Sequence, residues 1–249
     1  MREQISDFIA SKSVSEPTKQ AYRYDLEHFC SQVTLPVTPG ELALYQRSLE
    51  VLKPSVRQRK ASSINQFLRF LYQKNRLDYY IQLPKQVFPQ KQEVVPHFQE
   101  DVSILLEDSP HANGQLMAIL AAYMGLGVSD VLQLSWQSIA LDIGVLTAGG
   151  KTKKRVLKIP EPLLPFLIGW PSKKGYVFGG DRIYSRQWAY KTLQVYFISI
   201  GKPHWSMRYL RKHYIYQSLS AGISPDTLAR QLGISHITSL EMYQRWILH

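Results

Sequence analysis

The 249-residue sequence contains a single cysteine, Cys30, and no long apolar run. One cysteine excludes an internal disulfide and leaves a cysteine-based zinc site without enough ligands. No segment approaches the roughly 18 consecutive apolar residues that a membrane-spanning helix needs, and the residues that follow Met1 lack the apolar core of a signal peptide. We therefore expect a cytoplasmic protein that has no membrane partner.

Acidic residues are scarce relative to basic ones. Nineteen Asp and Glu stand against 30 Lys and Arg, which gives a net charge of +11 and an isoelectric point near 9.6. A surplus of this size favours a polyanionic partner, with nucleic acid ahead of an anionic membrane surface. The 45% of hydrophobic residues and 20% of charged residues are ordinary for a globular chain and exclude wholesale disorder.

The motifs of the commonest hydrolytic enzymes are missing. The seven histidines are scattered, and neither an HExxH zinc motif nor a GxSxG nucleophile elbow occurs. The segment Gly150-Lys151-Thr152 is not a phosphate-binding loop, because Val145 stands where that motif needs its first glycine. We therefore expect no metal site and no cofactor.

Prolines divide the chain. Pro84, Pro89 and Pro96 fall in a stretch without amphipathic period, through which no helix can continue. This pattern predicts an extended linker over 84–96 between an N-terminal domain, 1–83, and a C-terminal domain, 97–249. The alternative is a long loop inside one domain.

Local patterns predict a mainly α protein. In the N-terminal domain the apolar residues recur at helical spacing, and Thr38-Pro39 is typical of a helix start, so we expect helices only. In the C-terminal domain, 145–147 and 155–159 are typical of two antiparallel strands joined by a tight turn. Further helices are predicted over 116–124, 129–134, 162–170, 185–199, 208–220, 224–232 and 238–246.

One basic run lies in the N-terminal domain. Eight basic residues and a single acid, Asp78, occur between Lys53 and Lys85. A merely soluble helix face mixes the two signs of charge, so this bias favours contact with a phosphate backbone over a solvated face. The candidate contacts in this run are Arg57, Arg59, Lys60 and Arg69.

The C-terminal domain carries a second set of cations. Five positive charges and no acid occur within 151–158, and Arg208 and Arg211 lie three residues apart on a predicted helix, so both can point the same way. Guanidinium groups neutralise a phosphate, a lysine protonates a leaving oxygen, and a hydroxyl such as that of Tyr243 can act as nucleophile. Taken singly, each of these residues has an ordinary explanation as packing or as a solvated surface. The candidate DNA contacts here are Lys153, Lys154, Arg155 and Lys212.

Four blocks of sequence, in order, resemble the tyrosine recombinase (phage integrase) family, and within it the XerD-like proteins of bacteria. The N-terminal segment Lys19-Gln-Ala-Tyr-Arg-Tyr-Asp-Leu-Glu-His-Phe29 is similar to the helical core-binding domain of that family. The four blocks are Gly125-Leu-Gly-Val-Ser-Asp-Val-Leu-Gln-Leu-Ser-Trp136, Gly150-Lys151-Thr-Lys-Lys-Arg-Val, Leu210-Arg211-Lys-His-Tyr-Ile-Tyr-Gln-Ser-Leu-Ser-Ala-Gly222 and Leu228-Ala-Arg-Gln-Leu-Gly-Ile-Ser-His-Ile-Thr-Ser-Leu-Glu-Met-Tyr243.

The resemblance implies a chemistry and a fold. In this family a tyrosine attacks a DNA phosphodiester and forms a 3′-phosphotyrosine without metal or ATP. Carried over by position, the nucleophile is Tyr243, a phosphate-binding arginine is Arg211 and the acid is Lys151. The resemblance also implies duplex DNA as partner, and a homo-oligomer or a partner recombinase on that DNA. The implied fold is an N-terminal helical core-binding domain followed in the chain by a mostly helical catalytic domain with a small antiparallel sheet.

Three positions depart from the family pattern. Gly127 replaces the first arginine, Arg208 replaces a histidine, and Ile234 replaces the His or Trp that assists the reaction. Arg208 lies one helical turn from Arg211, so it is a candidate to supply the missing charge, although it can equally face solvent. The resemblance therefore implies a recombinase with a degenerate site and weak strand exchange. A DNA-binding protein that has lost the chemistry is the alternative, and an RNA-binding or protein-interaction module is a third.

Overall fold

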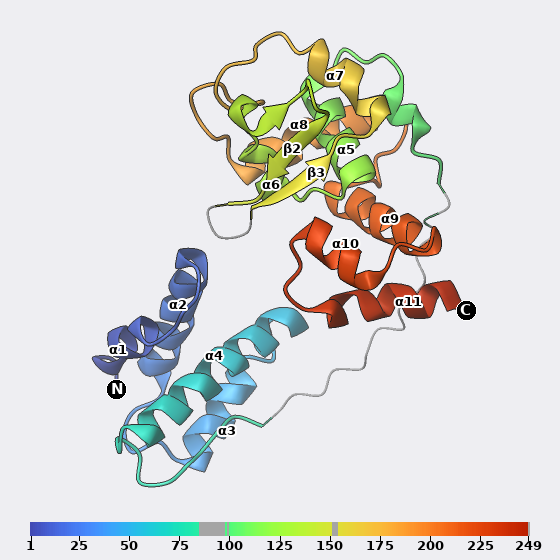
Figure 1. The fold of residues 1–249 in the computed structure, drawn as a ribbon. Coiled ribbons are helices and arrows are strands. Elements are labelled where there is room, and N and C mark those ends of the chain that lie inside the picture. Colours follow the sequence, from blue (N-terminus) through green and yellow to red (C-terminus); the bar gives the residue numbers. More distant parts are fainter. Residues whose placement is uncertain (85–97, 99, 151–153, 249) are drawn as a thin grey trace. The chain divides into compact units, whose positions relative to one another are not determined.

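The computed structural model describes residues 1–84, 98, 100–150 and 154–248 (Figure 1). The chain divides into two compact units, Met1–Glu93 and Val94–His249, and the predicted domains, 1–83 and 97–249, fall on either side of this division. Apart from Pro84, the predicted linker lies outside the described residues. No described helix is long and apolar enough to cross a membrane.

The N-terminal unit is built from helices, as predicted: α1 (Gln4–Ala10), α2 (Glu16–Gln32), α3 (Pro39–Ser48) and α4 (Pro54–Gln73). Thr38 starts α3 through a capping box, in which its hydroxyl accepts from the main chain of Glu41 and the Glu41 carboxylate accepts from the main chain of Thr38. The core is apolar, and in it Phe8 of α1 packs edge to face on Phe67 of α4, with ring centroids 5.4 Å apart.

The C-terminal unit is organised around one buried helix. Helix α5 (Ala112–Met124) is apolar on nearly all sides and packs against α8 (Arg186–Ser199) and α9 (Met207–Ser220). The sheet beside it has the order β1-β2-β3 and is antiparallel (Figure 1). Strands β2 (Val145–Ala148) and β3 (Arg155–Lys158) confirm the two predicted strands, and β1 (Ile139–Ala140) is a two-residue addition.

Short elements complete the unit: α6 (Val128–Leu132), α7 (Leu164–Ile168), α10 (Pro225–Leu232) and α11 (Glu241–Leu248). Helix α5 ends at Gly125 and α10 ends at Gly233, and both glycines have left-handed backbones, with φ of 62° and 67°. A side chain at Gly125 would also collide with the ring of Tyr214. These two helix ends matter for the site, because the carbonyl groups of Gly125 and Leu232 accept hydrogen bonds from Arg211 of α9.

Helices α9, α10 and α11 enclose a second, smaller core in this unit. Leu228, Leu232 and Leu240 are buried in it together with Tyr243 of α11. Beside it, Phe98 lies against the rings of Tyr209, Tyr216 and Trp246. The mainly α fold with one small antiparallel sheet is therefore confirmed.

Candidate phosphate-binding and catalytic site

Arg211 is held at the ends of two helices. Its Nη1 donates a hydrogen bond to the carbonyl of Gly125 (2.7 Å) and its Nη2 to the carbonyl of Leu232 (3.1 Å). These are terminal carbonyls of α5 and α10, which lack partners inside their own helices and attract a cation. The side chain is 24% exposed, and its burial lowers the pKa of the guanidinium while Asp130, 3.9 Å from Nη1, raises it. Arg211 is therefore a fixed, partly open cation.

Tyr243 lies within electrostatic range of two arginines. The residue is 5% exposed, and its ring meets that of Trp246 edge to face, with centroids 5.2 Å apart. Desolvation raises the pKa of the phenol, and the positive charges of Arg211 and Arg208 lower it. The structure thus brings Tyr243, Arg211 and Arg208 into one electrostatic neighbourhood, although they are up to 35 residues apart in sequence.

Arg208 and Arg211 share a cavity of about 410 Å³. Its walls are the first turn of α6, the first turn of α9 and the beginning of α8. The Arg208 side chain is exposed, and among the described residues its guanidinium has no hydrogen bond or ion pair. We call this space the arginine cavity, because three guanidinium groups line it: those of Arg186, Arg208 and Arg211.

Arg155, a predicted DNA contact, is half-buried and hydrogen-bonded within the protein. Its Nη2 donates to Oδ2 of Asp130 (2.7 Å), its Nε donates to the carbonyl of Gln231 (2.6 Å), and its side chain is 10% exposed. It joins β3 to α6 and α10, and it neutralises the carboxylate that also lies near Arg211. These bonds engage two of its donor nitrogens inside the protein, and a phosphate contact from Arg155 stays a prediction.

The basic run of the N-terminal unit is also partly internal. Lys60 is 4% exposed, with its Nζ 3.4 Å from Oδ1 of the fully buried Asp25. This pairing does not favour a DNA contact from Lys60, which stays a prediction. Arg59 donates to the same carboxylate, and its side chain stays half-exposed. Arg57 is half-buried, and Arg69 is exposed beside a groove of α4.

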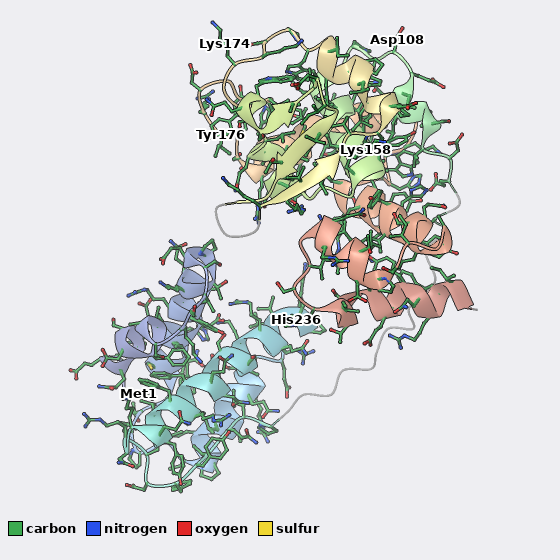
Figure 2. The ribbon with its side chains drawn as sticks, in the orientation of Figure 1. Met1, Asp108, Lys158, Lys174, Tyr176 and His236 are labelled. Carbon is green, nitrogen blue, oxygen red and sulfur yellow. The ribbon has the colours of Figure 1, made fainter. Side chains whose placement is uncertain are left out.

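The remaining predicted cations of the C-terminal unit differ in their exposure. Lys151 and Lys153 lie outside the described residues. Lys154 is exposed, and Lys158 is exposed at the end of β3 (Figure 2). Lys212 is half-buried, with its Nζ 5.9 Å from the ring centroid of Trp246.

Comparisons with known proteins identify the family. No protein-family model matches the chain. Over 245 residues it is 39% identical to a protein of Streptococcus suis (strain 05ZYH33) named "Tyrosine recombinase XerD-like", covering 98% of this chain and all of the relative. A protein of the same name from Streptococcus mutans is 38% identical over 242 residues, covering 96% of this chain and 97% of the relative. The chain belongs to the XerD-like tyrosine recombinases.

Solved structures share the fold of this XerD-like chain. A lambda integrase dimer bound to a COC′ core site superimposes with a TM-score of 0.69 at 14% identity, over 97% of this chain and 93% of that one. The XerH site-specific recombinase bound to difH substrate gives 0.69 at 13% identity, over 98% and 82%. At this level of identity the likeness concerns the fold alone.

Two positions where this XerD-like chain departs from the family pattern lie at the site. Gly127 lines the arginine cavity, where a Cβ atom would lie 3.3 Å from Nη1 of Arg211. Ile234 follows the end of α10 and packs against the small apolar core around Tyr243. An apolar side chain donates no hydrogen bond, so this position contributes shape and no proton or charge. His236, two residues later, is exposed in the connection to α11 (Figure 2).

Arg186 lines the arginine cavity but was not among the predicted site residues. This residue opens α8, and its Nη2 donates to the hydroxyl of Ser129 on α6 at 2.7 Å. No spacing in the sequence links it to Arg211, which lies 25 positions further on. The one local signal is Ser185, which caps α8 and so fixes where the following side chain emerges.

Among the described residues, no group of three or more His, Cys, Asp or Glu is arranged to hold a metal ion. The residues that the structure brings together here supply guanidinium groups, a buried phenol and terminal helix carbonyls. Guanidinium groups arranged in this way are suited to binding an anion.

Proposed function

We propose that this chain binds duplex DNA through its phosphate backbone and forms, slowly, a covalent bond to it through Tyr243. The observation that carries the proposal is the position of Tyr243 next to the helix end that holds Arg211. Tyr243 packs in the same small core as Leu232, the carbonyl of Leu232 accepts a hydrogen bond from Nη2 of Arg211, and Arg211 and Arg208 line the arginine cavity. A recombinase function also agrees with the names of the relatives. We place this activity in the cytoplasm.

Support for DNA binding comes from charge and from fold. The net charge is +11, and Arg69, Lys154 and Arg208 are exposed cations. Lambda integrase and XerH, which share the fold, were solved bound to DNA, and lambda integrase was solved both as a dimer on a core site and as a tetramer on a Holliday junction. We infer that this chain also assembles with further copies, or with a partner recombinase, on duplex DNA.

The proposed reaction is a transesterification that conserves the number of phosphodiester bonds. The Oη atom of Tyr243 loses its proton and attacks the phosphorus, a P–O5′ bond breaks, and the leaving 5′ oxygen takes up a proton. The product is a 3′-phosphotyrosine, which a 5′-hydroxyl can attack to rejoin a strand. Arg211 and Arg208 offset the negative charge that develops on the phosphate. Lys151, by its place in the family pattern, is the expected proton donor.

Three features of the site make the reaction slow. Gly127 removes a guanidinium, a group that in phosphoryl transfer is worth on the order of 10³ to 10⁵ in rate. Ile234 removes an acid–base or hydrogen-bonding group, worth on the order of 10² to 10⁴. Burial raises the pKa of Tyr243, so less of the nucleophile is ionised at neutral pH.

A second candidate is DNA binding without cleavage. The 5% exposure of Tyr243 favours it, since a buried phenol must emerge before it can reach a phosphorus. Both candidates require the same cationic surface and differ only in the covalent step.

A trapping experiment separates them. A nicked duplex carrying palindromic sites of the difH type releases a short fragment when it is cut, so a covalent complex accumulates and migrates slowly in a denaturing gel. We expect a slowly accumulating adduct with the natural protein and none with Tyr243→Phe. An adduct that persists in Tyr243→Phe contradicts the proposed nucleophile, and DNA binding without any adduct supports the second candidate.

Salt dependence tests the binding step by itself. If several phosphates are contacted, the logarithm of the association constant falls with log salt by about 0.9 per contact. A flat plot for the natural protein contradicts DNA binding of either kind.

A further inference from the structure

Arg186 of α8 extends to the α6 wall of the arginine cavity, where Gly127 contributes no side chain. We propose that Arg186 binds a DNA phosphate there together with Arg208 and Arg211. It thereby supplies a third guanidinium in place of the arginine that the family pattern has at position 127 and this chain lacks. This inference rests on the proposed function, because it names the residue that compensates at the same site.

The position of Arg186 supports the assignment. Its Nη2 is 2.7 Å from the hydroxyl of Ser129, which stands two residues after Gly127 in the first turn of α6. Both residues line the arginine cavity with Arg208 and Arg211. The Arg186 side chain therefore lies beside the place that a side chain at position 127 would enter, although it comes from another helix.

The charge balance of the cavity also supports it. The acid of the lining, Asp130, is paired with Arg155 at 2.7 Å and lies 3.9 Å from Arg211. The partner of Arg186 among the described residues is a neutral hydroxyl, which takes one of its five N–H donors and none of its charge. The cavity thus holds more positive than negative charge and has donors left for an anion, the arrangement that suits a planar guanidinium fork and a phosphate.

The helices that form the cavity add to this charge. Arg186 is the first residue of α8. Ser206 caps α9, and the first two residues of α9, Met207 and Arg208, also line the cavity. Both helices are 14 residues long, so their positive ends favour a bound anion.

A purely structural role is the competing explanation: Arg186 would only tie α8 to α6 through Ser129. Ser129→Ala separates the two, because it removes the tie and leaves the guanidinium in place. Under the structural explanation Ser129→Ala resembles Arg186→Ala. Under the phosphate-binding proposal it resembles the natural protein.

The test compares the full-length natural protein with Arg186→Ala and Ser129→Ala on a mixed-sequence duplex over a range of salt. We expect Arg186→Ala to reduce the salt slope by about 0.9, equivalent to one phosphate contact, and Ser129→Ala to keep the natural slope. An unchanged slope in Arg186→Ala overturns the proposal, as does an equal reduction in Ser129→Ala. A flat slope in the natural protein instead contradicts the proposed function.

A titration with inorganic phosphate, followed by ³¹P line broadening, tests the cavity without DNA. We expect broadening with the natural protein and with Arg182→Ala, and its loss with Arg186→Ala. Arg182 is the matched control, because its exposed guanidinium lies over the ring of Tyr184, 5.3 Å from the centroid, and outside the cavity lining. Equal broadening in all three proteins overturns the proposal, whatever the DNA experiments show.

Discussion

Gly127 adjoins the guanidinium of Arg211: a Cβ atom at position 127 would lie 3.3 Å from Nη1. The position that has lost its arginine therefore lies directly beside the arginine that is kept. A contact of 3.3 Å requires Nη1 to shift by a few tenths of an ångström, and the φ of Gly127 is an ordinary −86°, so the backbone itself accepts a larger residue.

We expect Gly127→Arg to accelerate formation of the covalent DNA adduct. The added guanidinium enters the arginine cavity, and because Ile234 stays apolar we expect part of the value of such a group, on the order of 10² in rate. The measurement is the rate of adduct accumulation on nicked duplex at saturating protein. Gly127→Met, similar in length but neutral, is the control; equal rates in the two variants contradict a charge effect at this position.

Lys154, which immediately precedes β3, and Arg155, which begins it, should respond differently to truncation. Lys154→Ala removes an exposed charge, so we expect it to lower the salt slope of DNA binding by up to about 0.9 and to leave stability unchanged. Arg155→Ala leaves Asp130 without its 2.7 Å partner, so we expect it to lower the urea midpoint. The reverse pattern would show that Arg155 faces DNA after all.

The ion pair of the N-terminal unit is expected to be sensitive to loss of one partner. Asp25→Asn leaves Lys60 buried without a countercharge, and breaking a buried pair in this way costs about 3–5 kcal/mol. Asp25→Asn/Lys60→Met should recover most of this loss. Circular dichroism in urea measures the change; since all five tryptophans lie after residue 135, their fluorescence should report an unaltered C-terminal unit. Equal stability of Asp25→Asn and the natural protein contradicts the pairing.

Features that depend on neighbouring residues could be predicted from the sequence. The helix start at Thr38-Pro39 and the end of the helix predicted over 224–232 are set by the rules of helix ends, and both are confirmed. A helix was predicted over 238–246. The structure has helical turns there, but the segment begins with a 3₁₀ turn, Ile237–Leu240, and the α-helix, α11, starts only at Glu241.

Features that depend on distant residues could not be predicted. Whether a cation in a basic run reaches solvent depends on which acid the fold brings to it: Asp25 pairs with Lys60 across 35 positions, and Asp130 pairs with Arg155 across 25. Counting charges along the chain does not show this. Arg186 was missed for the same reason, because only the packing of α8 beside α6 brings it to Ser129.

Acidification should destabilise the C-terminal unit through His213. This residue is 7% exposed, and burial lowers its pKa, while Glu100 and Asp101 act in the opposite direction. The unfolded chain takes up a proton at about pH 6.5 and the folded chain only below that, so stability is complete above pH 6.5 and falls as the pH drops below it. Tryptophan-detected urea midpoints should therefore decline between pH 7.5 and 5.5, and less so in His213→Gln. Parallel curves for the two proteins contradict this assignment.

The most direct test of the central claim is the identity of the residue that becomes bonded to DNA. Trypsin cuts after Arg230 and Arg245 and releases residues 231–245, in which Tyr243 is the one tyrosine. After trapping on nicked duplex and nuclease digestion, mass spectrometry should find this peptide carrying a nucleotide 3′-phosphate on Tyr243. Finding the nucleotide on another residue, or finding this peptide unmodified while the DNA is bound, would contradict the account.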